Sequence, residues 1–318
     1  MSHPPKTYEL RIAINVSDKC QSLAIKERVR LVLNRCGIDS FVEGEIVNVD
    51  VDNEPGGPER DFYGDLGGAF SPISVFKYDR EHMDELAVEL EKELKTNISI
   101  SFHSMETEIW MEGWKESFRP IESELFYVYP PWEKLPTGLK KIPIVIEPGM
   151  AFGTGQHATT QLCIRSLEKI FGNAESDLPH SMLDVGTGTA ILSIAAAKLG
   201  CKNIDASDID PDSILAARRN IAENGISTIR LMNDSTPPVD RRSDFARRGY
   251  EIVVANILPV VLRDIMSDLI NAVAEGGILL LSGFLNEQEE ELNQLVRNRG
   301  LSKIDSWRLD GWTSTLYG

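Results

Sequence analysis

The sequence predicts an α/β protein in which a doubly wound, mostly parallel sheet follows a smaller α+β domain. From residue 157 onward, short strands rich in Val, Ile and Leu alternate with helices, as in a parallel sheet covered on both faces. Residues 1–106 instead have the order strand-helix-strand-strand-helix-strand. The length of 318 residues suits two domains.

The N-terminal region, residues 1–106, has the element order of a ferredoxin-like sandwich. Alternating polar and apolar residues predict strands at 8–16, 41–51, 73–78 and 98–104. Helical spacing predicts helices at 18–37 and 79–95, and a loop rich in Gly, Pro and Asp occupies 52–70. Because a fold alone does not define a function, this region is interpreted only as a small scaffold that binds a partner.

An aromatic-rich stretch occupies residues 107–146, and its simplest interpretation is a linker packed on its neighbour. A short helix is expected at 107–118, followed by two strands around a turn, within 124–132 and 142–148.

The C-terminal region, residues 147–318, carries the alternating pattern. Strands are expected at 181–186, 203–208, 228–234, 251–257, 277–283, 303–308 and 312–317. Helices are expected at 158–171, 190–199, 211–224, 259–274 and 286–299. Because only a short turn joins the last two strands, they should form an antiparallel hairpin at the edge of the sheet.

Composition limits the class of partner. The 33 basic and 49 acidic residues give a net charge of −16, which repels phosphate backbones and attracts basic proteins. We therefore expect no direct nucleic-acid specificity. The four cysteines are widely spaced, with no metal-ligand pattern. No apolar run is long enough for a membrane span, and the N-terminal residues have no apolar stretch of the kind found in signal peptides. These features predict a cytoplasmic protein without a metal or membrane partner.

A glycine-rich turn, Gly186-Thr187-Gly188, follows the first strand of the parallel region. Such a turn lets the backbone approach a ligand closely, and the next helix offers unpaired N–H groups. A dinucleotide fingerprint would need Gly or Ala at Ile191, and the phosphate-binding GKS or GKT sequence is absent. The acidic Asp184 before the turn completes a pattern that resembles motif I of methyltransferases that use S-adenosyl-L-methionine (AdoMet).

Two further strand ends carry polar side chains. Asp208 ends the second parallel strand, where a ribose-binding carboxylate is expected, whereas Asp210 before Pro211 is better interpreted as a helix N-cap. Asn256 ends the fourth strand. From the residues alone, Asn256 either faces a ligand at the carboxyl edge of the sheet or caps the helix that follows Pro259.

The segment 147–160, EPGMAFGTGQHATT, places glycines, hydroxyls, one His and one Phe directly before a helix. It predicts a flexible loop with hydrogen-bond donors at a helix N-terminus. Capping and loop hydrogen bonding are commoner roles for His157 than catalysis.

Four segments together closely resemble the bacterial ribosomal protein L-eleven methyltransferase (PrmA) family: EPGMAFGTGQHATT, LDVGTGTAILSIAAAKLG, SDIDPDSILAARRN and VVANIL. The resemblance covers about 107–318 and implies a Rossmann-like class I methyltransferase domain. It departs from the family pattern at Ala190, where the family has Gly, and at Glu147, where the family has Asp.

The resemblance implies that AdoMet is the cofactor and that the protein methylates amino groups, a Lys side chain or an N-terminus, of a large-subunit ribosomal protein, free or on the subunit. Residues 1–106 would then recognise the substrate. By motif match, the resemblance implies AdoMet contacts at Thr160, Gly186, Asp208 and Asn256. Gly188 of the same turn is expected to join them. Phe152 and Thr154 are expected to close the loop over AdoMet.

For the reaction itself, we expect the Asn256 side-chain oxygen and the carbonyl groups of Ile257 or Leu258 to orient the amine. Two alternatives stay open on the sequence alone. One is an AdoMet-dependent methyltransferase of another protein or of a small-molecule amine. The other is a non-catalytic AdoMet-binding adaptor that docks on the ribosome.

Overall fold

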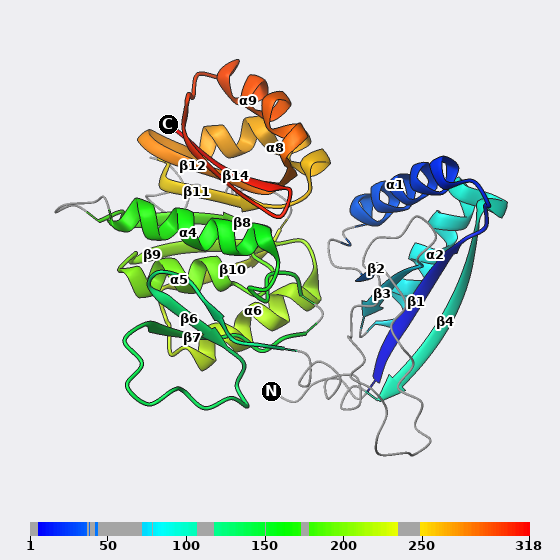
Figure 1. The fold of residues 1–318 in the computed structure, drawn as a ribbon, viewed down its shortest axis with the longest axis horizontal. Helices are drawn as coiled ribbons and strands as arrows, with labels where there is room; N and C mark the ends of the chain where they lie inside the picture. The colour runs from blue at the N-terminus through cyan, green and yellow to red at the C-terminus, as the bar shows by residue number, and fades with distance from the viewer. Residues whose placement is uncertain are drawn as a thin grey trace. The chain divides into compact units, whose positions relative to one another are not determined.

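A computed structural model describes residues 6–36, 38, 42–43, 72–77, 79–106, 118–149, 151–172, 178–234 and 249–318. The chain divides into two compact units, Met1–Phe118 and Arg119–Gly318 (Figure 1). None of the described helices is long and apolar enough to cross a membrane.

The described elements of the first unit follow the predicted order. They are β1 (Lys6–Ile14), α1 (Lys19–Arg35), β2 (Val42–Glu43), β3 (Ile73–Lys77), α2 (Arg80–Leu94), the 3₁₀ turn η1 (Lys95–Asn97) and β4 (Ile98–Glu106). The sheet is antiparallel, with strand order β2-β3-β1-β4. The expected loop 52–70 and most of the expected strand 41–51 lie outside the described residues.

The core of this unit forms because alternate residues of β1 point to one side of the sheet. Leu10 and Ile12 pack there against apolar residues of both helices, such as Val29 of α1 and Leu90 of α2. The side chain of Asp79 starts α2 by accepting a hydrogen bond from the backbone N–H of Glu81.

The second unit begins with a three-stranded sheet of β5 (Ile121–Glu122), β6 (Phe126–Tyr129) and β7 (Ile142–Val145). The sequence did not predict β5. The two strands expected in this stretch are present as β6 and β7, and they pair in parallel. A parallel pair needs a long crossover, which residues 130–141 supply. Phe126 packs into the core of the second unit. The expected helix at 107–118 lies almost wholly outside the described residues.

The large sheet has the order β10-β9-β8-β11-β12-β14-β13. Its strands are β8 (Ser181–Val185), β9 (Asn203–Asp208), β10 (Ile229–Asn233), β11 (Tyr250–Asn256), β12 (Val273–Leu285), β13 (Lys303–Leu309) and β14 (Trp312–Tyr317). The first five are parallel, and β14 runs antiparallel to both neighbours. The predicted edge hairpin is therefore confirmed.

Helices cover both faces of this sheet, as the doubly wound pattern predicted. They are α4 (Ala158–Gly172), α5 (Ile191–Leu199), α6 (Pro211–Glu223), α8 (Pro259–Ala272) and, after the 3₁₀ turn η2 (Asn286–Gln288), α9 (Glu289–Arg297). Side chains of β11 alternate between the two faces. Ile252 and Val254 pack with α4, α5 and α6, whereas Val253 and Ala255 pack with α8 and α9.

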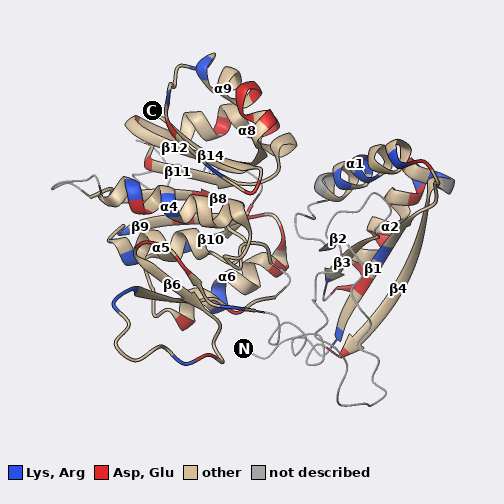
Figure 2. Ribbon diagram, in the orientation of Figure 1, with Lys and Arg blue, Asp and Glu red and all other residues tan. Residues whose placement is uncertain are grey.

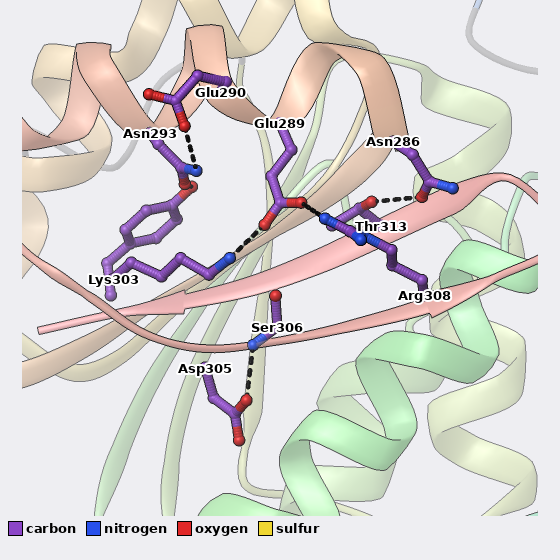
Figure 3. Close-up of polar contacts among 10 residues, drawn as sticks. Asn286, Glu289, Glu290, Asn293, Lys303, Asp305, Ser306, Arg308 and Thr313 are labelled. Carbon is purple, nitrogen blue, oxygen red and sulfur yellow. Dashed lines mark hydrogen bonds and ion pairs between the residues drawn. The ribbon is translucent and has the colours of Figure 1, made fainter.

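The edge hairpin is attached to α9 by a buried carboxylate. Glu289 is 4% exposed and accepts hydrogen bonds from Lys303 at 2.5 Å and from Arg308 at 2.6 Å (Figure 3). The first turn of α9 is acidic (Figure 2), a placement that the helix dipole favours. These contacts hold β13 beside α9.

Candidate active site

The predicted site residues lie in the second unit, mostly at the carboxyl ends of parallel strands. The turn with Gly186 and Gly188 follows β8, Asp208 ends β9, and Asn256 ends β11. Thr160 lies in the first turn of α4. Neighbouring parallel strands end at the same edge of a sheet. Because β8 lies between β9 and β11, the turn after β8 lies beside the ends of both of these strands.

The glycine turn is packed closely on two other predicted segments. Both glycines have positive φ, +72° at Gly186 and +54° at Gly188. A Cβ atom on Gly186 would lie 2.3 Å from a methyl group of Ile257, and one on Gly188 would lie 2.3 Å from the Phe152 carbonyl oxygen. Any side chain at these positions would therefore displace either Ile257 or the loop before α4.

Ala190 begins α5 in the left-handed conformation, with φ of 65°. The turn therefore forms without the third glycine of the family pattern. An alanine there costs roughly 1–2 kcal/mol of backbone strain that glycine would avoid.

Asp208 connects the end of β9 to the glycine turn. Its side chain is 2% exposed, and its two oxygens accept hydrogen bonds from the backbone N–H groups of Gly188 and Asp210, each at 2.9 Å. Asp210 caps α6 by accepting a bond from the Asp212 N–H at 3.0 Å, so its predicted N-cap role is confirmed.

Asn256 presents a buried amide oxygen with no hydrogen-bond partner among the described residues. The residue is 8% exposed. The alternative that Asn256 caps α8 is wrong, because Leu258 is the N-cap residue of this helix and the Asn256 amide oxygen accepts no bond from the described residues. Leaving a buried acceptor unpaired costs about 1–3 kcal/mol, which a ligand that donates a hydrogen bond would recover.

Ile257 and Leu258 form the turn between β11 and α8. The Leu258 carbonyl accepts the first helical hydrogen bond, from Leu262 at 3.0 Å. Gly283 of β12, with φ of +94°, lies so close that a Cβ atom on it would be 2.2 Å from the Ile257 carbonyl oxygen. Sequence reasoning missed Gly283, whose only signal was a glycine at the end of a strand.

The loop before α4 is attached to the glycine turn. The Thr189 N–H donates to the Phe152 carbonyl at 3.0 Å, and the Thr189 hydroxyl donates to the Gly153 carbonyl at 2.5 Å. Thr154 is partly exposed, and Thr160 is fully buried with a hydroxyl oxygen that has no partner within the described ranges. The loop therefore lies against the predicted cofactor turn.

His157 packs between two aromatic rings. Its ring centroid lies 5.3 Å from that of Phe152 and 4.9 Å from that of Trp312, and its Nδ1 lies 2.8 Å from the Thr159 hydroxyl. Burial lowers the pKa of His157 below its usual 6.5. These contacts agree with the predicted role in loop hydrogen bonding. Sequence reasoning missed Trp312 as a neighbour.

Asp184 was noted as part of the motif, but it was not among the predicted site residues. It is 1% exposed, and its Oδ2 accepts hydrogen bonds from the hydroxyls of Thr187 at 2.7 Å and Ser193 at 2.6 Å. Its Oδ1 has no partner in the described part of the chain. Burial raises the pKa of Asp184, and the bonds from Ser193 and Thr187 oppose that rise.

These features fit a ligand rich in hydrogen-bond donors. Five buried side-chain oxygens have no partner among the described residues: those of Thr160, Asp184 and Asn256 belong to the predicted motifs, and those of Ser207 and Thr315 do not. The glycine turn leaves no room for a Cβ atom and lets the backbone approach a ligand closely. AdoMet carries an ammonium group and a ribose diol, so its donors match these acceptors.

Comparison with known proteins gives one consistent result. The family model described as ribosomal protein L11 methyltransferase (PrmA) matches residues 26–317. The ribosomal protein L11 methyltransferase of Bacillus subtilis strain 168 is 30% identical over 282 residues, covering 86% of this chain and 85% of the relative. The ribosomal protein L11 methyltransferase of Geotalea uraniireducens strain Rf4 is 39% identical over 218 residues, covering 66% of this chain and 67% of the relative.

A solved structure agrees with these matches. The crystal structure of a ribosomal protein L11 methylase from Lactobacillus delbrueckii subsp. bulgaricus has a TM-score of 0.56 and 32% sequence identity to this chain. The matched region covers 63% of this chain and 98% of the methylase chain.

Proposed function

Because this chain belongs to the ribosomal protein L11 methyltransferase (PrmA) family, we propose that it transfers methyl groups from AdoMet to amino groups of ribosomal protein L11. The observation that carries the proposal is the buried amide oxygen of Asn256 beside the glycine turn, which has no hydrogen-bond partner among the residues that the structure describes. An oxygen in this position suits an amine that must be held by its hydrogens.

In this proposal, residues at the carboxyl edge of the large sheet would hold AdoMet, which would supply an electrophilic methyl group on its sulfonium. The Asp208 carboxylate holds the ribose hydroxyls, and the turn with Gly186 and Gly188 lies against the methionine part. Thr160 adds a hydroxyl from α4, while Phe152 and Thr154 close the loop over the cofactor.

The nucleophile is a neutral amine, either a Lys side chain or an N-terminus. A Lys with a pKa near 10.4 is about 0.1% neutral at pH 7.4, which costs about 4 kcal/mol. A neighbouring sulfonium disfavours the ammonium form and reduces this cost. The protein contributes mainly orientation, through the Asn256 oxygen and the Ile257 carbonyl. The Leu258 carbonyl is less suitable, since it already accepts a bond from Leu262.

We place substrate recognition in the N-terminal region, residues 1–106. The net charge of −16 favours a basic partner such as a ribosomal protein over nucleic acid. The substrate would be L11, either free or on the large subunit.

The test is methyl transfer from labelled AdoMet to undermethylated large-subunit ribosomal proteins, with Asn256→Ala as the control and peptides identified by mass spectrometry. Label on L11 with the wild-type chain, strongly reduced with Asn256→Ala, is the expected result. Label on another protein or on a small amine would move the proposal to a different substrate. AdoMet binding without transfer to any amine would favour an adaptor.

A further inference from the structure

Thr189 makes three hydrogen bonds that join the glycine turn to its surroundings. The residue is completely buried. Its N–H donates to the Phe152 carbonyl at 3.0 Å, and its hydroxyl donates to the Gly153 carbonyl at 2.5 Å. Its own carbonyl accepts a bond from the Asn220 side chain at 3.0 Å. One threonine therefore connects the turn to both the loop before α4 and helix α6.

Asn220 completes the connection from α6. It is also completely buried, and its Oδ1 accepts a hydrogen bond from the backbone N–H of Glu147 at 2.9 Å, where the segment that leads to the loop begins. One turn later, Asn224 binds both the N–H of Val145 at 3.0 Å and its carbonyl at 2.7 Å. Helix α6 thus holds the segment that enters the loop, while Thr189 holds the loop itself.

The same turn is held by the proposed ribose carboxylate, because Gly188 next to Thr189 donates to Asp208. A ligand that stabilises the turn must therefore also stabilise the bonds that fasten the loop. Thermodynamic linkage makes this relation reciprocal, so a loosened loop must weaken ligand binding.

We propose that Thr189 and Asn220 are positioning residues that couple AdoMet binding at the glycine turn to the order of loop 151–157. The inference rests on the proposed function, because it takes AdoMet as the ligand of the turn. The side chains of both residues are already engaged with backbone groups, so they act through the loop and the turn.

The first test compares Thr189→Val with Thr189→Ser. Valine keeps the shape and the backbone N–H but removes the bond to the Gly153 carbonyl, whereas serine retains the hydroxyl. A lost buried hydrogen bond corresponds to about a tenfold change in an equilibrium constant. We expect Thr189→Val to weaken AdoMet binding about tenfold by calorimetry and Thr189→Ser to restore most of it.

A second readout separates positioning from general stability. Hydrogen exchange of residues 151–157 should slow when AdoMet binds to the wild-type chain, and Thr189→Val should lose this protection. Ser181→Ala is the matched control. Its hydroxyl, which accepts a hydrogen bond from the backbone N–H of Glu251 at 3.1 Å, lies at the opposite end of β8. This control should leave both AdoMet affinity and the protection of the loop unchanged.

If Thr189→Val fails to fold, Asn220→Asp provides the same test. Aspartate keeps an acceptor for the Glu147 N–H but loses the donor to the Thr189 carbonyl. Unchanged loop exchange and AdoMet affinity in the folded variants would overturn the coupling. A wild-type chain that binds AdoMet but does not methylate L11 would overturn the proposed function alone, since exchange would still measure the coupling. A wild-type chain that binds no AdoMet would overturn both.

Discussion

Asp208 and Gly188 are joined by a hydrogen bond of 2.9 Å, from the glycine N–H to the carboxylate. The residue that we propose to hold the ribose therefore also shapes the turn that we propose to lie against the methionine part of AdoMet. On this proposal, replacing Asp208 would remove a ligand contact and loosen the turn at the same time.

We predict that Asp208→Asn weakens AdoMet binding by about 10- to 100-fold, because charged hydrogen bonds contribute about 1.5–3 kcal/mol. Calorimetric titration measures the effect. Asp210→Asn is the matched control, since asparagine caps helices as well as aspartate does and α6 should keep its N-cap. Equal affinity of Asp208→Asn and Asp210→Asn would contradict the ribose assignment.

Asn256→Ala should separate turnover from cofactor affinity. The Asn256 oxygen is unpaired among the described residues, so its removal leaves no orphaned partner there. If it orients the amine, we expect kcat to fall by about 10²-fold, within the range for a lost positioning contact, while the Kd for AdoMet changes little. Single-turnover kinetics and calorimetry on the same preparation provide the comparison, and equal losses in kcat and affinity would refute this role.

Much of the second unit could be predicted from the sequence because the determining signals are local. Runs of Val, Ile and Leu between helical segments predicted the parallel sheet, and strand ends then placed Asp208 and Asn256 at one edge. The hairpin of β13 and β14 followed from its short turn. Each of these inferences uses only residues that lie close together in the sequence.

The rest depends on segments that meet only after folding. The parallel pairing of β6 with β7 depends on how residues 130–141 cross over, and periodicity does not encode that path. Likewise, no sequence pattern shows that Gly283 meets Ile257, that His157 packs on Trp312, or that Asn220 reaches Thr189. Roles that arise from such long-range contacts were therefore missed.

His157 should titrate below pH 6.5, because burial between Phe152 and Trp312 disfavours the imidazolium. A lowered pKa means that the unfolded chain binds the proton more readily. The contribution of neutral His157 to the free energy of unfolding is therefore fully present above pH 6.5 and decreases as the pH falls below that value. Imidazole NMR gives the pKa directly. Trp312→Ala should move it back toward 6.5, and an unshifted value in the wild-type chain would contradict the prediction.

Glu289 should make the edge hairpin sensitive to acid. Burial alone would raise its pKa, but hydrogen bonds from Arg308 and Lys303 lower it below the usual 4.5 (Figure 3). Stabilisation by a carboxylate with a lowered pKa is present above pH 4.5 and is lost as the pH falls through the folded value. Thermal unfolding between pH 7 and pH 3.5 should show this loss, and Glu289→Gln should lose stability at pH 7 and flatten the profile.

Gly283→Ala should impair turnover through Ile257. The new Cβ atom would lie 2.2 Å from the Ile257 carbonyl oxygen, a backbone group that cannot rotate away, and φ at this position is +94°. The strand must therefore shift and carry Ile257 with it, and a displacement near 1 Å costs about 10²-fold in rate.

Gly225→Ala is the control for backbone strain, because Gly225 also has positive φ, +66°, but its added Cβ would meet no atom within 4 Å among the described residues other than its own chain neighbours. Both variants should lose roughly 1–2 kcal/mol of stability from the left-handed conformation. Only Gly283→Ala should also lose kcat. Equal kcat values for the two variants, measured on folded protein with saturating AdoMet, would show that the close contact with Ile257 has no part in catalysis.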